Sequence, residues 1–491
     1  MPRPTAPTPS AGLPPAGPSG RRRRLAFLHL TFTWPPRGGA GVDVHEILSR
    51  LRDRYEVCLF VPVFSVGFRR FRTDRPLPYR VVTLPFHPWT YTVTGVKRAF
   101  RQAVDAFRPD LVIVGDAWTM KPHLVEAMAG YPVVSRYYAY ESLCLIRNGQ
   151  LFRHGAPCPN HLLRDPVTCR ACALAWITDS LVHRRLDQAA PLHELVMAGA
   201  LLPSFPATVR RSLHSAWQVI GYNSLLAGLV APHNPRVHLL HSGPGFDPRP
   251  PATNAGPGST PSPGSTPSPG SAPSPGSAPS PGSTPSPGSA PSPGSAPSPG
   301  STPTPSRPPW LATLDGLKAR GRRLVLVPGR LDDPAKGGAF ARAVAARVAA
   351  AHPDVCFVFT GNRSPAPAWE VHLGWVPGTE MPRLYRATHL CFVPSLWPEP
   401  QGIVAVEAFS LGRKVVAAAV GGLRDLVATQ PGGWVFPPGQ VEPAAQAILA
   451  ALAAPAPPHG PPAAGPLAAY TWEAILARFI DIIEADDTAP G

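Results

Sequence analysis

The stretch that most constrains this chain runs from Pro394 to Gly422 and reads PSLWPEPQGIVAVEAFSLGRKVVAAAVGG. The apolar run 390–393 in front of it predicts a short buried strand, which the following proline ends. Glu399 stands between two prolines, and because a residue before proline avoids the helical region, it belongs to an extended loop. The pattern then predicts a helix over 403–411 and a strand over 414–418. Ligands of such strand–loop–helix–strand units sit outside the carboxyl ends of the strands.

This unit brings two carboxylates to the start of a helix. Glu399 comes from the loop and Glu407 from the second turn of the predicted helix. Free N–H groups near Gly402 favour an anion such as a nucleotide diphosphate. A carboxylate accepts hydrogen bonds from sugar hydroxyls well, so the group suits a ligand that is part phosphate and part polyol. Two glutamates alone would be explained more simply as a solvated loop residue and an exposed helix residue.

The longer pattern carries more information. P-S-x-x-x-E-P-x-G-x-x-x-x-E-A-x-x-x-G-x-x-V-V-A-x-x-x-G-G resembles the signature of family-4 retaining glycosyltransferases of the GT-B fold, also called glycosyl transferases group 1. The resemblance implies that Glu407 binds the donor ribose and that Glu399 contacts the donor sugar near the reaction centre. Gln401 and Gly402 fall among the donor-binding positions. Gln401 stands where the family often has phenylalanine, so the identity of the donor sugar stays open.

Two further loops match the same family. Arg330 and Lys336 follow a predicted strand over 323–327, and two cations on such a loop can straddle a diphosphate, although surface charges are common. The loop resembles the family's Gly-Arg and Lys-Gly element, which implies that both residues bind the donor pyrophosphate and assist catalysis. Gly38 and Gly39 resemble the family's GG loop facing the donor; an ordinary turn is the alternative. If the cations stabilise the leaving group, no catalytic metal or other cofactor is required.

The N-terminal half is expected to hold the acceptor. Predicted strands over 57–64, 110–115 and 132–135 alternate with helical stretches, which indicates a parallel α/β sheet. The candidates for acceptor contact follow these strands: Asp116, His123, Arg136 and Tyr138. Many relatives carry a histidine after the last of these strands, but this chain has Arg136 there, so no catalytic histidine is transferred. A histidine at a helix start, like His123, is more often structural.

A largely helical insertion over 141–216 contains a cysteine group. Cys158, Cys169 and Cys172, with His161 as the fourth ligand, can form a tetrahedral structural zinc site. His154 and Cys144 are alternative fourth ligands, and simply buried thiols are the competing explanation. The 7 cysteines do not form the framework of a disulfide-rich secreted protein.

The predicted fold class is α/β of the GT-B type, with two Rossmann-like parallel-sheet domains facing a cleft. A Pro-Ser-Gly repeat between them has no charge and no large apolar residue, so it cannot bury a core and reads as a disordered linker. The predicted parts are a disordered tail (1–20), the acceptor domain (21–248), the linker (249–308), the nucleotide-sugar-binding domain (309–465) and a crossover helix (466–487).

The net charge of +16 permits an anionic membrane surface or nucleic acid as a partner. Basic and aromatic residues are not interleaved and no nucleic-acid motif is present, so we expect no nucleic-acid partner. No apolar run reaches the roughly 18 residues of a membrane span, and the apolar stretch after Arg21–Arg24 is too short for a signal peptide. A cytoplasmic protein is expected, with peripheral contact to the inner face of the membrane left open.

The resemblance implies a retaining, hexosyltransferase-like enzyme that moves a sugar from a nucleotide-sugar donor to an acceptor hydroxyl. It also implies front-face attack, with the leaving phosphate helping to take the acceptor proton. The acceptor can be a saccharide, a lipid-linked sugar or a small molecule, in polysaccharide, glycolipid or glycoconjugate synthesis. The alternatives are a non-catalytic sugar-nucleotide-binding scaffold and a nucleotide-sugar epimerase of the same fold.

Overall fold

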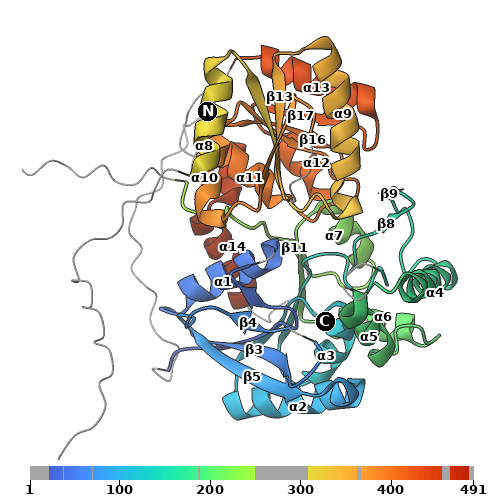
Figure 1. The fold of residues 1–491 in the computed structure, drawn as a ribbon. Coiled ribbons are helices and arrows are strands. Elements are labelled where there is room, and N and C mark those ends of the chain that lie inside the picture. Colours follow the sequence, from blue (N-terminus) through green and yellow to red (C-terminus); the bar gives the residue numbers. More distant parts are fainter. Residues whose placement is uncertain are drawn as a thin grey trace, which may run out of the picture. The chain divides into compact units, whose positions relative to one another are not determined.

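Seven parallel strands form the sheet of the N-terminal half, in the order β11-β10-β7-β6-β1-β3-β5 (Figure 1). The central strands are short apolar runs that are almost entirely buried, as expected where helices cover both faces of a parallel sheet. The strands are β1 (Arg24–Leu28), β3 (Glu56–Phe64), β5 (Arg80–Phe86), β6 (Leu111–Val114), β7 (Val133–Arg136), β10 (Gln218–Gly221) and β11 (Val237–Leu239). A separate small pair joins β2 (Thr33–Trp34) and β4 (Arg72–Thr73).

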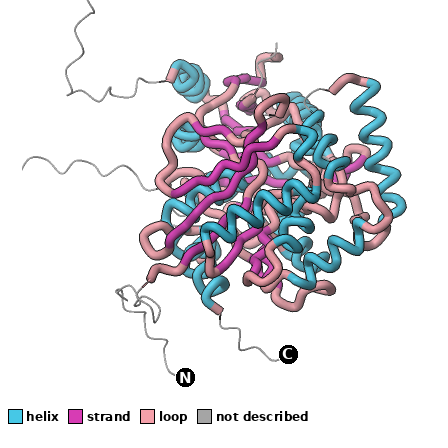
Figure 2. The backbone as a smooth tube through the Cα atoms, turned by 90° about the horizontal axis from the view of Figure 1, so that it is seen from below, coloured by secondary structure: helices cyan, strands magenta, loops and turns pink. Residues whose placement is uncertain are grey.

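Helices flank the strands on both sides (Figure 2). Helix α2 (Val93–Phe107) shows why: Thr92 caps it by accepting a hydrogen bond from the Gly95 N–H at 3.1 Å, and its buried apolar residues recur every three or four positions. The other helices of this half outside the insertion are α1 (Gly39–Leu51), α3 (Lys121–Ala127) and α7 (Ser224–Val230), and α6 (Phe205–Ser215) closes the insertion. Helix α1 begins within the glycine-rich loop, at Gly39.

Six parallel strands form the second sheet, in the order β14-β13-β12-β15-β16-β17. The strands are β12 (Arg323–Val327), β13 (Val355–Thr360), β14 (Glu370–Gly374), β15 (Leu390–Val393), β16 (Lys414–Ala418) and β17 (Gly433–Phe436). Its helices are α8 (Pro309–Ala319), α9 (Gly338–Ala351), α10 (Met381–Ala387), α11 (Ile403–Ser410), α12 (Gly421–Val427) and α13 (Val441–Ala453). The predicted α/β class with two parallel sheets is confirmed.

The last helix, α14 (Trp472–Glu484), packs on the N-terminal half. The Phe479 ring lies 6.3 Å from the Phe27 ring on β1. The Trp472 indole N–H donates to the Pro244 carbonyl at 3.0 Å, and Arg54 Nη2 lies 2.7 Å from a Glu484 carboxylate oxygen. The predicted return of the chain onto its first half is therefore observed.

The insertion contains helices α4 (Pro166–Val182) and α5 (Ala189–Met197), as predicted, and one element that was not predicted. This is a short antiparallel hairpin of β8 (Phe152–Arg153) and β9 (Ala156–Pro157). None of the helices in the described residues is both long and apolar enough to span a membrane.

The computed structural model describes residues 21–36, 38–68, 70–146, 149–185, 188–248, 308–361, 366–455 and 465–485. The predicted disordered tail and nearly all of the predicted linker lie outside these residues.

A buried ion pair links helix α1 to strand β7. Arg136 is 0% exposed, and its Nη2 atom lies 2.9 and 2.8 Å from the two carboxylate oxygens of Asp43, which is equally buried. The guanidinium also stacks near the Tyr138 and Tyr222 rings. The prediction that Arg136 reaches the acceptor is therefore wrong in placement, since its charge is used inside the domain.

We predict that Asp43→Ala lowers the free energy of unfolding by about 3–5 kcal/mol, because it leaves the Arg136 charge buried without a partner. Urea denaturation followed by circular dichroism measures the loss. Asp53→Ala is the matched control, since the Asp53 side chain is 86% exposed. A change below about 1 kcal/mol for Asp43→Ala would show that the pair does not hold α1 to the sheet.

Candidate functional site

A cavity of about 1320 Å³ lies among loops that follow strands of both sheets. Its lining includes most of the predicted site residues. From the N-terminal half these are Gly38, Gly39, Asp116 and Tyr138, and from the C-terminal half Arg330, Lys336, Glu399, Gln401, Gly402 and Glu407. Arg136 and His123 do not line it.

Glu399 and Lys336 form an ion pair at the cavity. The Lys336 ammonium donates to a Glu399 carboxylate oxygen at 2.5 Å, and the Ser395 hydroxyl donates to the same oxygen at 2.7 Å. The ammonium also lies 5.2 Å from the centre of the Trp397 ring. The carboxylate is thus held in one orientation by a cation and a hydroxyl, while the half-buried ammonium remains accessible from the cavity.

A tight turn places Lys336 there. Pro334–Lys336 forms one turn of 3-10 helix, which Asp333 caps by accepting from the Ala335 N–H at 3.0 Å. Gly337 follows in the left-handed region, with φ of +74°. A Cβ atom at that position would lie 2.2 Å from the Pro394 carbonyl oxygen, so the turn presses against the loop that carries Glu399.

Arg330 lies on the exposed side of the same loop system. Its side chain has no hydrogen-bond or ion-pair partner among the residues that the structure describes. Arg330 and Lys336 therefore present two cations to one cavity, a planar guanidinium and a compact ammonium. Of the two, only Lys336 already has an ion-pair partner among the described residues.

Helix α11 points its first turn at the cavity. Gly402 precedes it with φ of +86°, and a Cβ atom there would lie 2.3 Å from a Leu423 methyl carbon, so glycine is required. No side chain of the described residues caps this helix, so its first N–H groups remain available to an anion.

Glu407 lies one turn further along α11. Its carboxylate accepts from the Tyr385 hydroxyl at 2.9 Å and from the Gly245 N–H at 3.2 Å, which comes from the N-terminal half. Burial raises the pKa of Glu407 to about 7, against the lowering effect of these two hydrogen bonds. The Glu407 carboxyl therefore changes charge near neutral pH.

Gln401 makes contacts that its sequence position did not predict. Its amide oxygen accepts from the Ser242 N–H at 2.5 Å, and its amide N–H donates to the Ser242 carbonyl at 2.6 Å. The buried side chain thus pairs with the backbone as a neighbouring strand would. This pairing uses one N–H and one oxygen lone pair of the amide.

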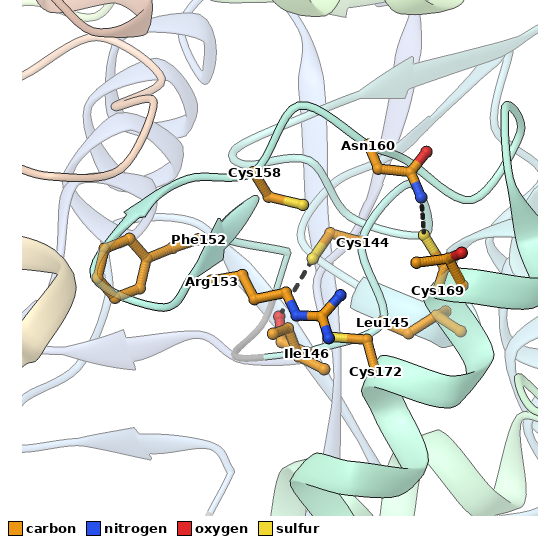
Figure 3. Close-up of a pocket in the computed structure, with 10 residues that line it drawn as sticks. Cys144, Leu145, Ile146, Phe152, Arg153, Cys158, Asn160, Cys169 and Cys172 are labelled. Carbon is orange, nitrogen blue, oxygen red and sulfur yellow. Dashed lines mark hydrogen bonds between the residues drawn. The ribbon is translucent and has the colours of Figure 1, made fainter.

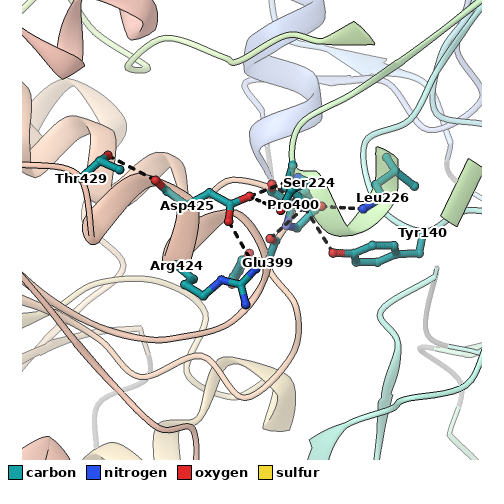
Figure 4. A network of polar contacts seen from close by, with 9 residues as sticks. Tyr140, Ser224, Leu226, Glu399, Pro400, Arg424, Asp425 and Thr429 are labelled. Carbon is teal, nitrogen blue, oxygen red and sulfur yellow. Dashed lines mark hydrogen bonds and ion pairs between the residues drawn. The ribbon is translucent and has the colours of Figure 1, made fainter. Parts of the chain in front are cut away.

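The loop around Glu399 is also held from behind (Figure 4). The Asn223 amide donates to the carbonyls of Pro400 at 2.8 Å and of Glu399 at 3.3 Å. The neighbouring Ser224 hydroxyl donates to Asp425 at 2.8 Å. Asn223 caps the start of helix α7, so one residue both begins a helix of the first half and fixes a loop of the second.

Polar residues of the N-terminal half face the cavity after strands β6 and β7. Asp116 accepts a short hydrogen bond from the Thr31 hydroxyl. The buried Glu141 also lines the cavity and accepts from the Tyr138 N–H at 3.0 Å. Burial raises the pKa of Glu141 to about 8, although the buried Lys121 ammonium, 3.8 Å away, lowers it. Burial therefore opposes the ionisation of Glu141, and the Lys121 ammonium favours it.

Two predicted residues lie elsewhere. A His123 ring nitrogen lies 2.9 Å from the Ala198 carbonyl, which agrees with a structural role for this histidine. His161 does not join the cysteine group, which lines a separate cavity discussed below.

Several lining residues had no sequence signal. Glu141 stands in an aromatic run without a motif. Trp375, which is 69% exposed at the rim of the cavity, differs from it, because residues 374–376 resemble the family's segment along the nucleobase. The Gln150 amide donates to Asp333 at 3.0 Å, which connects the insertion to the Lys336 turn. Only the position of Glu141 after a sheet strand could have suggested it.

Comparison with known proteins supports the resemblance. Residues 322–454 match the family model described as Glycosyl transferases group 1. The phosphatidyl-myo-inositol mannosyltransferase of Mycolicibacterium smegmatis is 32% identical over 148 residues, which are 28% of this chain and 38% of that protein. The curated relatives are matched over less than half of their length.

Solved structures resemble the whole fold. Sucrose-phosphate synthase from Thermosynechococcus elongatus superposes with a TM-score of 0.55 at 15% identity, covering 94% of this chain and 98% of that one. Anabaena HepE in complex with UDP and glucose gives a TM-score of 0.52 at 15% identity, covering 95% and 100%. The predicted GT-B arrangement of two parallel-sheet domains is confirmed by this likeness.

We predict that Gln401→Ala increases the hydrogen-exchange rate of the Ser242 amide, because it leaves a buried N–H and a buried carbonyl unpaired. Each unpaired group costs about 1–3 kcal/mol. Exchange followed by mass spectrometry over residues 240–246 measures the effect. The exposed Gln446→Ala is the control, and unchanged exchange at Ser242 would show that the pairing is absent in solution.

Proposed function

We propose that this protein is a retaining glycosyltransferase of family 4, which moves a hexose from a nucleotide-sugar donor to an acceptor hydroxyl. The observation that carries the proposal is the convergence of Arg330, Lys336, the uncapped start of α11 and Glu407 on one cavity. The match to glycosyl transferases group 1 and the likeness to HepE, whose structure contains UDP and glucose, support it.

The donor would lie along the C-terminal half. Its diphosphate would meet the Arg330 and Lys336 cations and the first N–H groups of α11. Its ribose hydroxyls would donate to the Glu407 carboxylate. The sugar would then lie near Glu399, opposite Gly38 and Gly39, with the exposed Trp375 ring at the rim.

The chemistry would be mainly electrostatic. The bond between the anomeric carbon and the phosphate oxygen breaks, the acceptor oxygen bonds to the same face of that carbon, and the acceptor proton passes to a leaving phosphate oxygen. Negative charge grows on the diphosphate in the transition state, where Lys336 and Arg330 stabilise it. The ion pair with Glu399 holds the ammonium in place before the donor arrives.

The acceptor would bind beside Asp116, Tyr138 and Glu141 on the N-terminal half. We propose a saccharide, a lipid-linked sugar or a small molecule, as in polysaccharide, glycolipid or glycoconjugate synthesis. A lipid-linked acceptor would bring the protein to the inner face of the membrane from the cytoplasm.

Lys336→Ala should reduce the rate of sugar transfer about 10²–10³-fold. The substitution removes one hydrogen-bond donor that stabilises the negative charge on the diphosphate in the transition state. The measurement is nucleotide release from a panel of UDP-, GDP- and ADP-sugars with mixed saccharide acceptors. Lys318→Ala on α8 is the matched surface control.

Wild-type protein that binds a donor but releases no nucleotide with any acceptor would favour a scaffold. Interconversion of the free nucleotide sugar without transfer would favour an epimerase. Equal loss in the Lys336→Ala and Lys318→Ala variants would remove Lys336 from the reaction.

Donor binding should weaken as the pH falls through the pKa of Glu407. Because burial raises this pKa to about 7, the carboxyl is ionised above pH 7 and neutral below it, and only the ionised form accepts well from two hydroxyls. The Kd for UDP-glucose should rise about tenfold between pH 8 and pH 6 in calorimetric titrations. Glu407→Gln should bind weakly at both pH values. A profile that is flat in the wild type would contradict the assigned role.

A further inference from the structure

Four cysteines of the insertion line one small cavity of about 30 Å³ (Figure 3). They are Cys144, Cys158, Cys169 and Cys172. The cavity lies wholly in the N-terminal half and shares none of its lining residues with the large cavity of the proposed active site.

The cysteines come from three separate segments. Cys144 lies in a turn after β7, where its N–H donates to the Tyr140 carbonyl at 3.0 Å. Cys158 directly follows β9, and its N–H donates to the Leu151 carbonyl at 2.6 Å. Cys169 and Cys172 lie in the first turns of α4, and a spacing of three places both on one face of the helix.

The thiols make few strong contacts. None of the 7 cysteines forms a disulfide bond. The Cys144 thiol donates to the Ile146 carbonyl at 3.7 Å. The Asn160 amide donates to the Cys169 sulfur at 3.7 Å. The remaining lining consists of three apolar and three polar or charged residues, which are Leu145, Ile146, Phe152, Arg153, Asn160 and Thr168. Four sulfur ligands in one pocket are the chemistry that selects a soft or borderline metal ion.

We propose that Cys144, Cys158, Cys169 and Cys172 hold one structural zinc ion. Four thiolates fill a tetrahedral shell, which leaves no open position and therefore indicates a structural site. This assignment replaces His161, the fourth ligand favoured by the sequence, because His161 does not line the cavity.

The site requires a local rearrangement. In the described residues, no three His, Cys, Asp or Glu side chains are already spaced as metal ligands. When the ion binds, the sulfurs must therefore converge on the cavity to Zn–S distances of about 2.3 Å. The small cavity volume suits a single ion and excludes a larger ligand.

A zinc ion at this position would stabilise the loop between β7 and α4. The only regular structure between Cys144 and Cys158 in the described residues is the β8–β9 hairpin. That segment carries Gln150, whose amide donates to Asp333 beside the Lys336 turn. The metal would thus fix a segment that contacts the large cavity, whatever reaction occurs there.

The test is the metal content of the full-length wild-type protein, purified without an affinity metal and measured by plasma mass spectrometry. About one zinc per chain is expected. Cys144→Ser and Cys169→Ser should lose most of the zinc. The controls Cys391→Ser, which alters a buried cysteine of β15, and His161→Ala should retain it.

The visible absorption spectrum of wild-type protein from cells grown with cobalt in place of zinc provides a second readout. This readout does not depend on the folding of variants. The spectrum should have the intense bands of a tetrahedral tetrathiolate site. Zinc-free wild type after growth in zinc-supplemented medium, an iron–sulfur spectrum, or zinc loss in His161→Ala but not in Cys144→Ser would each overturn the proposal.

Discussion

The ion pair between Lys336 and Glu399 is the interaction on which the geometry of the large cavity depends. It joins the loop after β12 to the loop after β15, two neighbouring strands of one parallel sheet. The Ser395 hydroxyl and the Asn223 amide hold the second loop from two further directions. A half-buried ammonium fixed in this way needs little reorganisation when an anion approaches it, and such preorganisation makes electrostatic catalysis effective.

In the N-terminal half, four ionisable residues are buried in two pairs. Arg136, Asp43, Lys121 and Glu141 are all almost completely buried. Such charges persist only when paired or hydrogen-bonded, and the first two stabilise the packing of α1 on the sheet. The other pair leaves a carboxyl oxygen of Glu141 without a hydrogen-bond partner at the edge of the cavity. The first pair thus fixes a helix on the sheet, and the second lies beside the large cavity, which Glu141 helps to line.

The sequence predicted the C-terminal sheet most accurately, because short apolar runs there end at glycine or proline. Strands β12, β15 and β16 have their predicted bounds, and the two glutamates, Arg330 and Lys336 line one cavity as expected. The pairing of Gln401 with Ser242 and the burial of Arg136 were not predictable. Gln401 pairs with Ser242 and Arg136 pairs with Asp43, and no local sequence pattern identifies partners so distant in the chain.

A crystal structure of the wild-type protein with UDP would locate the donor site directly. We expect the diphosphate oxygens within hydrogen-bond distance of Lys336 and Arg330, with the ribose hydroxyls on Glu407. UDP bound outside this cavity, or bound within it with the ribose away from Glu407, would contradict the proposed donor site.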